Sequence, residues 1–536
     1  MANSTTATLD AGAVPAPKPP PARPAAHPPL SGGKLILGTI ALSLATFMNV
    51  LDSSIANVSI PAISGDLGVS PNQGTWVITS FAVANAISVP LTGWLTTRFG
   101  AVRLFVLSIL LFVISSWLCG VAPNLETLLA ARVLQGAVAG PMIPLSQSLL
   151  LASYPAAKSS MALALWGMTT LVAPIMGPLL GGWISDNMTW PWIFYINVPI
   201  GIVTAYVTWA IYRDRETPTK VLPIDRIGLA LLVIWVGSMQ LMLDKGKELD
   251  WFHSSVIVAL SVIAVVGFLF FLAWELYEKH PIVDIHLFKG RNFAAGVVAI
   301  SVAYGLFFGN LVILPLWLQT IIGYTATDAG LVTAPVGIFA IILSPIIGRM
   351  LPKVDARWVA TTAFITFGVV SFMRAGFTTG VDTRALVIPT LIQGAAMAMF
   401  FIPLTSIILS GQPPEKIPAA SGLSNFVRIT FGAIGASIST TIWENRSALH
   451  HAQLVEQINP YNPIYQAQLD HLMQMGMSKM QAIGLIERNI TQQAAMLGAN
   501  DIFWISGVLF FVLIGFVWLT KRSKGGGGAA DAAGAH

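Results

Sequence analysis

Charged residues are scarce in this chain. Asp, Glu, Lys and Arg make up 10% of its 536 residues, whereas a soluble protein carries about a quarter. The single cysteine, Cys119, excludes an internal disulfide and a thiol pair. No Walker A phosphate loop is present, which argues against ATP-driven activity. We therefore expect no enzyme activity, no cofactor and no metal site.

Long apolar runs dominate instead, and hydrophobic residues make up 55% of the chain. A membrane span needs about 20 apolar residues to cross a hydrocarbon core of about 30 Å. In lipid the backbone must satisfy its own hydrogen bonds, so such segments form helices. Fourteen segments qualify: 35–60, 75–96, 102–122, 126–150, 161–184, 194–212, 227–243, 255–274, 294–318, 329–350, 358–377, 385–409, 419–443 and 501–520.

The placement of Lys and Arg predicts the orientation. With the N-terminus inside, 20 of the 29 Lys and Arg residues lie in inner tails and loops. Seven, including Arg374, then lie in outer loops, and Arg132 and Arg428 are left within spans. This bias predicts a multi-pass membrane protein with both termini cytoplasmic. The net charge of +5 then belongs to the inner rim and does not indicate nucleic-acid binding.

An internal repeat indicates duplication. LQGAVAGPMIPLS at 134–146 recurs as IQGAAMAMFFIPLT at 392–405, where Thr390 occupies the place of Arg132. The repeat joins span four to span twelve, so two extra helices lie between two six-helix halves. Parallel repeats with a substrate site at their interface are a known transporter design. The predicted parts are a disordered tail 1–33, a bundle 34–213, an insert 214–292, a bundle 293–522 with an outer loop 444–500, and a flexible tail 523–536.

Further segments resemble a known family. They are LDSSIANVSIPAI at 51–63, QGTWVITSFAVANAISVPLTGWL at 73–95, MGPLLGGWISD at 176–186, WIFYINVPIG at 192–201 and SGLSNFVRITFGAIGASISTTIW at 421–443. These residues resemble the fourteen-span drug:proton antiporter branch of the major facilitator superfamily. The resemblance implies an all-α membrane fold of 6 + 2 + 6 helices in the bacterial inner membrane, and proton-driven export by alternating access.

The loop after span two departs from the superfamily pattern. Gly93 and Arg98 remain, but Thr97 stands at the usual acidic position and Ala101 at a basic one. An inner gate held closed by the acidic residue that other members carry at position 97 is therefore in doubt. Contact between Arg98 and the neighbouring helix is an alternative way to hold the gate closed.

Asp52 and Arg132 are charged residues inside predicted spans, where a charge costs on the order of 2.5–3.5 kcal/mol. Counted at 1.5 Å per residue, Asp52 lies roughly 25 Å from the inner face and Arg132 roughly 10 Å from the outer face. The resembled fold places their helices side by side. We therefore predict that they pair and couple transport to protons, with a static ion pair as the alternative.

Two other charged residues have open interpretations. Arg428 in span thirteen, one turn after Asn425, attracts anionic substrates, pairs with a carboxylate in the other half, or extends along the cavity wall toward inner water. Asp328 at the start of span ten is either a solvated helix cap or a site of cation recognition.

The GPLLGG segment of span five contains Gly177, Pro178, Gly181 and Gly182. It indicates close helix packing, and in the resembled family it marks exporters. A mixed substrate cavity is predicted from polar and adaptable apolar residues in the spans, with core packing as the alternative. The set is Asn49, Gln135, Tyr304, Phe308, Asn310, Trp317, Gln393, Met397, Asn425 and Arg428.

The outer loop 444–500 has amphipathic stretches near 464–474 and 478–497, and it either covers the outer mouth or docks an adaptor. The resemblance implies a periplasmic membrane-fusion adaptor and an outer-membrane channel as partners. Proton-driven export of hydrophobic compounds is the favoured function. Proton-coupled uptake of a small hydrophobic or anionic solute is the main alternative, and a non-transporting sensor is disfavoured by the buried charges.

Overall fold

The computed structural model describes residues 28–221, 223–456, 458–459 and 461–522, which form helices and no strand. Residues 1–27 of the predicted tail 1–33 and the predicted tail 523–536 lie outside this part of the chain, whereas α1 already begins at Gly32. The N-terminal half contains α1 (Gly32–Asp66), α2 (Pro71–Gly74), α3 (Trp76–Ser88), α4 (Thr92–Phe99), α5 (Ala101–Gly120), α6 (Leu125–Ala139), α7 (Met142–Ser153), α8 (Ser159–Asn187), α9 (Trp192–Tyr195) and α10 (Asn197–Tyr212).

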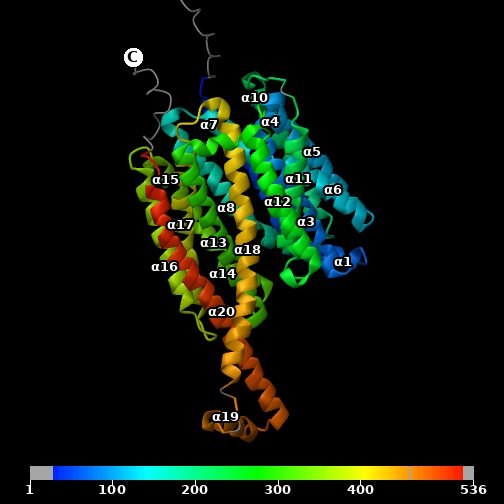
Figure 1. The fold of residues 1–536 in the computed structure, drawn as a ribbon, viewed down its shortest axis with the longest axis vertical. Coiled ribbons are helices and arrows are strands. Elements are labelled where there is room, and N and C mark those ends of the chain that lie inside the picture. The colour runs from blue at the N-terminus through cyan, green and yellow to red at the C-terminus, as the bar shows by residue number, and fades with distance from the viewer. Residues whose placement is uncertain (1–27, 222, 457, 460, 523–536) are drawn as a thin grey trace, which may run out of the picture.

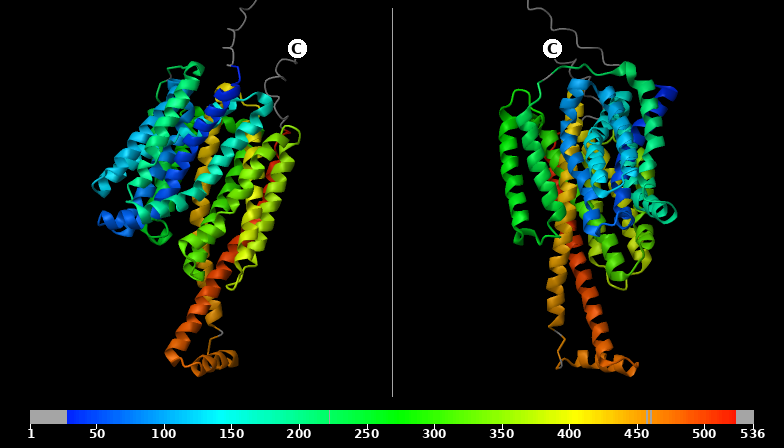
Figure 2. Two further views of the ribbon diagram at one scale, coloured as in Figure 1. Left: turned by 180° about the vertical axis from the view of Figure 1, so that it is seen from behind. Right: turned by 90° about the vertical axis from the view of Figure 1, so that its right-hand side faces the viewer.

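Two inserted helices and a second bundle follow. The inserted hairpin consists of α11 (Arg226–Lys245) and α12 (Ser255–Tyr277). The C-terminal half contains α13 (Arg291–Trp317), α14 (Ala326–Thr333), α15 (Val336–Met350), α16 (Ala356–Ala375), α17 (Thr383–Leu409), α18 (Ile417–Val455), α19 (Pro463–Gln474) and α20 (Lys479–Trp518). Figures 1 and 2 show the two halves side by side.

Within the described residues, twelve helical segments are long and apolar enough to cross a membrane. The two predicted spans outside this set, 161–184 and 419–443, correspond to α8 and α18, which pack against α1 and α13. The fold is therefore that of an all-helical, multi-spanning protein. The count of fourteen spans stays a prediction.

The first and last described segments lie at the same end of the bundle, which we call the terminal end (Figure 1). Arg215 there donates a hydrogen bond to the Pro28 carbonyl, and Arg291 donates one to the Leu519 carbonyl. We call the other end, where α19 lies, the opposite end.

The repeated Gln-Gly pairs bring neighbouring helices into backbone contact. A Cβ on Gly136 would collide with the Phe81 carbonyl of α3, and a Cβ on Gly394 would collide with the Val336 carbonyl at the start of α15. Only glycine allows this approach, because any side chain would displace backbone atoms. The repeat therefore marks the same tight helix contact in both halves.

The two halves touch directly at the terminal end. A Cβ on Gly93 in α4 would lie 2.9 Å from the Ala419 Cα of α18. On the other side of the bundle, a Cβ on Gly348 in α15 would lie 2.8 Å from the Ala164 Cβ of α8. The side chains of Gln147 and Ser421 hydrogen-bond across the same seam. The structure is thus closed between its halves at this end.

The inserted hairpin connects the halves near the opposite end. Asp244 in α11 accepts a hydrogen bond from Thr79 of α3. Ser437 of α18 donates to the Leu243 carbonyl at 3.0 Å, and Lys247 pairs with Glu444 at 2.7 Å. The hairpin therefore lies against both α3 and α18.

The predicted outer loop 444–500 is largely helical. At 1.5 Å per residue, α18 and α20 are each about 60 Å long, and both project beyond the bundle to meet α19 (Figure 1). Asp501 accepts hydrogen bonds from Arg446 at 2.6 Å and from His450 at 2.8 Å, which joins the two helices. Leu469, Leu472 and Ile486 form a small separate core at the tip.

Candidate functional site

A buried ion pair lies inside the N-terminal half. Arg132 Nη1 of α6 donates to Asp52 Oδ2 of α1 at 2.6 Å, and neither side chain has any solvent exposure. The pairing predicted from the depths of the two residues and from the resembled fold is confirmed. Two opposite charges removed from water together require further hydrogen bonds, because desolvation otherwise exceeds their attraction.

Those further hydrogen bonds come from three helices. Gln135 Nε2 donates to Asp52 Oδ1 at 3.0 Å, and Asn197 Nδ2 from α10 donates to the same oxygen at 2.9 Å. Ser116 of α5 accepts from Gln135 at 2.6 Å and from Asn197 at 3.2 Å. Asn197 and Ser116 were not among the residues predicted from the sequence. Asn197 could have been predicted, because it is a polar residue within the apolar segment WIFYINVPIG at 192–201.

The guanidinium of Arg132 is fixed on several sides. Its Nε donates to the Val77 carbonyl at 3.0 Å, and its Nη1 also donates to Gln135 Oε1 at 2.6 Å. The rings of Phe81 and Phe194 lie 4.3 and 5.4 Å from the guanidinium carbon. Arg132 therefore keeps an acceptor in Gln135 and aromatic neighbours even when Asp52 loses its negative charge.

The C-terminal half contains a matching cluster without a carboxylate. Each member lies 258 positions after its N-terminal counterpart: Asp52 and Asn310, Ser116 and Arg374, Arg132 and Thr390, Gln135 and Gln393. Arg374 Nη2 donates to Gln393 Oε1 at 2.6 Å and to Thr390 Oγ1 at 3.3 Å. Asn310 Oδ1 accepts from Ser506 at 3.1 Å.

The assignment of Arg374 to an outer loop was wrong. It lies in α16 and is 2% exposed. Its guanidinium lies over the Phe503 ring at 6.0 Å, and no carboxylate pairs with it among the described residues. In this cluster the arginine occupies the position that corresponds to Ser116 in span three, not the one that corresponds to Arg132 in span four. The amide of Asn310 occupies the position that corresponds to the Asp52 carboxylate.

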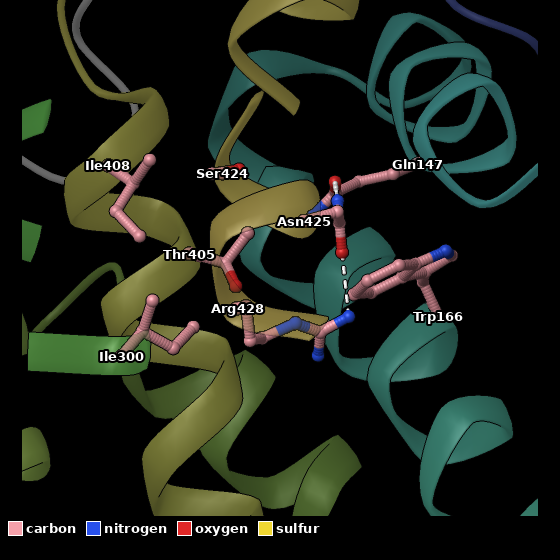
Figure 3. A pocket seen from close by; sticks show the side chains of 8 residues that line it. All are labelled: Gln147, Trp166, Ile300, Thr405, Ile408, Ser424, Asn425 and Arg428. Atoms are coloured by element: carbon pink, nitrogen blue, oxygen red, sulfur yellow. Dashed lines mark hydrogen bonds between the residues drawn. The ribbon is translucent and has the colours of Figure 1, made fainter. Parts of the chain in front are cut away.

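A small pocket lies between the halves (Figure 3). Gln147 of α7 and Trp166 of α8 come from the N-terminal half, and Arg428, Asn425 and Thr405 are among the residues from the C-terminal half. Asn425 Nδ2 donates to Gln147 Oε1 at 3.2 Å, and Arg428 Nη2 donates to Asn425 Oδ1 at 2.6 Å. The remaining lining residues are Ile300, Ile408 and Ser424.

Aromatic rings surround Arg428. Its guanidinium carbon lies 4.9 Å from the Tyr304 ring and 5.1 Å from the Phe401 ring, and the residue is 5% exposed. The Phe308 ring is 5.3 Å from that of Tyr304. Four predicted cavity residues, Tyr304, Phe308, Asn425 and Arg428, are thus grouped at or beside the seam between the halves.

The other predicted cavity residues lie within the half-bundles. Asn49 donates to the Ala139 carbonyl at 3.0 Å and is 1% exposed. Trp317 stacks on Phe377, and Met397 of α17 is buried in a hydrophobic core that contains residues of both halves. Gln135, Asn310 and Gln393 belong to the two polar clusters described above. These residues were predicted because their side chains are polar or adaptable. Side-chain type alone does not tell whether a residue lies at the seam between the halves or in the interior of one half.

The glycines of the GPLLGG segment differ in their surroundings. A Cβ on Gly177 would collide with Ser54 of α1, and one on Gly181 would lie 3.0 Å from the Ile55 carbonyl. Gly182 has nothing within 4 Å of the same position. The side chain of Pro178 lies outside the described part of the structure. Close packing of α8 against α1 therefore depends on Gly177 and Gly181.

We expect Gly177→Val and Gly181→Val to lower stability by about 1–3 kcal/mol or more, because each forces backbone atoms of α1 and α8 apart. Gly182→Val is the matched control on the same helix. The measurement is the melting temperature of the detergent-solubilised protein together with transport. Equal melting temperatures for all three variants would contradict the packing role of Gly177 and Gly181.

A carboxylate does occupy the loop after span two, although Thr97 stands at the usual acidic position. Glu216, which follows α10, accepts hydrogen bonds from the backbone N–H groups of Val102 and Arg103 at 2.9 Å each. It caps the start of α5, where a negative charge is favourable. Arg98 lies near the rings of Trp94 and Phe99, at 5.8 and 5.9 Å.

The corresponding loop of the C-terminal half has its own acidic residue. Asp355 caps α16 and pairs with Arg357 at 2.8 Å. The hydrogen bonds from the Arg357 side chain hold the pKa of the Asp355 carboxyl below its usual range. Arg357 also donates to the Thr520 carbonyl. In each half a carboxylate thus connects the loop to the end of the last helix of that half. Glu216 does this after α10, and Asp355 does it through Arg357, which reaches Thr520 after α20.

Asp328 forms a capping box with Thr325 at the start of α14. Its side chain accepts from Thr325 Oγ1 at 2.7 Å, and the residue is exposed. The structure agrees with the helix-cap interpretation.

Comparisons with known proteins were consistent with one another. Residues 42–436 match the Major Facilitator Superfamily. The chain is 57% identical to the multidrug export protein EmrB of Escherichia coli (strain K12), over 95% of this chain and 99% of that protein. It is 51% identical to the fatty acid resistance protein FarB of Neisseria gonorrhoeae, over 94% and 99% of the two chains. The proton:xylose symporter XylE has a similar fold, with a TM-score of 0.54, 13% identity and coverage of 92% and 98%.

Proposed function

The chain belongs to the Major Facilitator Superfamily, and we propose that it is a multidrug exporter which exchanges hydrophobic compounds for protons. The identity of 57% to a multidrug export protein over nearly the whole chain supports the export of drugs. A transporter of this kind uses the proton gradient and needs no bound cofactor.

The buried Asp52–Arg132 pair is the observation that carries proton coupling. Burial disfavours the ionised form of a carboxylate, and a neighbouring guanidinium favours it. A conformational change that hydrates Asp52 or separates it from Arg132 would change its affinity for a proton. Gln135 then holds Arg132, so the proton can be bound without leaving the guanidinium free of an acceptor.

In this proposal α8 and α18 complete fourteen spans in the bacterial inner membrane, and both termini are cytoplasmic. The excess of Lys and Arg at the terminal end supports this orientation. The contacts of Gly93 with Ala419 and of Gly348 with Ala164 then close the cytoplasmic side. Alternating access requires these contacts to separate in the opposite conformation.

The projection formed by α18, α19 and α20 would extend into the periplasm. Apolar side chains are exposed at its tip, among them Ile464 at 78% and Met480 at 80%. Isolated exposed apolar residues are common, but a group of them indicates a binding surface. We propose that this surface docks a membrane-fusion adaptor, which connects the pump to an outer-membrane channel.

A drug-dependent proton flux assay in proteoliposomes tests the function. With an inward proton gradient, we expect a hydrophobic drug to leave the cytoplasmic compartment while protons enter it. Drug movement without proton movement would refute antiport. Accumulation of the drug on the cytoplasmic side would instead support the second candidate, proton-coupled uptake.

A further inference from the structure

Arg428 differs from the other two arginines buried in the bundle. Arg132 is neutralised by Asp52, and Arg374 lies inside the C-terminal half with Gln393 and Thr390. Arg428 lies at the seam between the halves, and no carboxylate pairs with it among the described residues. A buried charge without a counter-charge is costly, so its retention at this place requires a reason.

The side chain does not extend to water at the terminal end, which was one of the alternative interpretations. It is 5% exposed, and Arg428 Nη2 is used by Asn425 at 2.6 Å. Tyr304 and Phe401 hold the guanidinium by contacts of about 5 Å between cation and ring. Figure 3 shows Arg428 and Asn425 directed toward the side of the pocket that Trp166 and Gln147 form.

The pocket beside Arg428 is small in this conformation. Its volume is about 10 Å³, which is close to the space that one water molecule needs. Gln147 and Trp166 belong to one half and Arg428 to the other, so separation of the halves enlarges the pocket. Of the three arginines buried among the described residues, Arg428 thus lies beside a pocket between the halves, whereas Arg132 and Arg374 lie inside their own halves.

We propose that Arg428 binds the acidic group of amphipathic anions carried by this protein, such as a carboxylic acid with a long apolar chain. This inference rests on the proposed export function and adds the residue and the chemical group that it recognises. The planar guanidinium suits a carboxylate. Tyr304, Phe401 and Ile300 provide the apolar wall beside it, and Asn425 orients the guanidinium.

Paired substrates separate this role from a structural one. Export of a long-chain fatty acid and of the fatty alcohol of the same length is measured in proteoliposomes with wild type, Arg428→Gln and Arg428→Lys. We expect Arg428→Gln to lower export of the acid by about tenfold or more, the effect of losing one charged hydrogen bond. Export of the alcohol should change by less than about twofold, since it lacks the charge that the guanidinium recognises.

Arg428→Lys is the second variant, and it decides the matter if Arg428→Gln does not fold. Lysine keeps the charge but loses the planar fork, so export of the acid should fall by several-fold with export of the alcohol unchanged. Equal losses for both compounds, or no loss for either, would overturn the assignment of Arg428. A wild type that exports a hydrophobic drug but not the acid would overturn the assignment of Arg428 and leave the export function intact, whereas a wild type that does not export the drug either would refute the export function itself.

Discussion

Asp52→Asn is expected to abolish drug-dependent proton movement in proteoliposomes. Asn is close to Asp in shape and can accept the hydrogen bonds of Gln135 and Asn197, but it cannot take up and release a proton. Drug binding should persist, because Asp52 lies within the N-terminal half and not at the seam. The measurement is proton flux upon addition of drug, compared with drug binding to the same preparation.

Asp66→Asn is the matched control, because Asp66 ends the same helix and accepts a hydrogen bond from Trp190 at 2.7 Å, and no cation pairs with it among the described residues. Loss of one partner of a buried ion pair costs about 3–5 kcal/mol, so the melting temperature of Asp52→Asn must be measured too. Asp52→Asn combined with Arg132→Gln removes the lone charge and should recover stability without recovering coupling. Wild-type proton flux in Asp52→Asn would refute the coupling role.

The sequence predicted the coupling pair because membrane depth can be counted along a helix. Asp52 and Arg132 both lie well inside apolar segments, and the internal repeat indicated which helices belong to one half. Their charges also made them conspicuous, since a charge in lipid needs a reason. Depth and charge, together with the resembled fold that places the two helices side by side, predicted the contact at 2.6 Å.

The rest of the site depends on contacts that no single segment contains. Arg374 is near the end of its helix, so counting Lys and Arg placed it in a loop. Its burial comes from Gln393 on α17 and Phe503 on α20. Asn197 likewise donates a hydrogen bond to Asp52 only because α10 packs against α1. Predicted cavity residues such as Asn49 and Trp317 have side chains suited to a substrate cavity, but these side chains contact residues of their own half.

The projection at the opposite end was predicted in part: the amphipathic stretches near 464–474 and 478–497 coincide with α19 and the first part of α20, but the extension of α18 was not predicted. Residues 444–455, ENRSALHHAQLV, are too polar for a membrane span and were interpreted as part of a loop. They remain helical because α18 pairs with α20, where His451 contacts Glu487 at 2.8 Å and Arg446 contacts Asp501. The stability of this helix outside the bundle therefore comes from tertiary contacts rather than from apolarity.

Gly93→Val is expected to stop transport by preventing closure of the terminal end. A Cβ at this position would lie 2.6 Å from the Ala419 Cβ and 2.9 Å from its Cα. Backbone atoms cannot move away as a flexible side chain would, so α4 and α18 must separate. In an alternating-access mechanism the protein would then stay open toward the side of its termini, and transport should fall to the background of empty liposomes.

Accessibility distinguishes this trapped state from simple unfolding. Ser421→Cys, in a Cys119→Ala background, places a thiol at the closed seam opposite Gln147. A polar maleimide added from the side of the termini should label this thiol faster in Gly93→Val than in the protein with Gly93. Gly237→Val on α11, where nothing lies within 4 Å of the new Cβ, should leave labelling and transport unchanged. Slow labelling combined with normal transport in Gly93→Val would show that α4 and α18 need not meet at this point, and the terminal-end seam would then not be a gate.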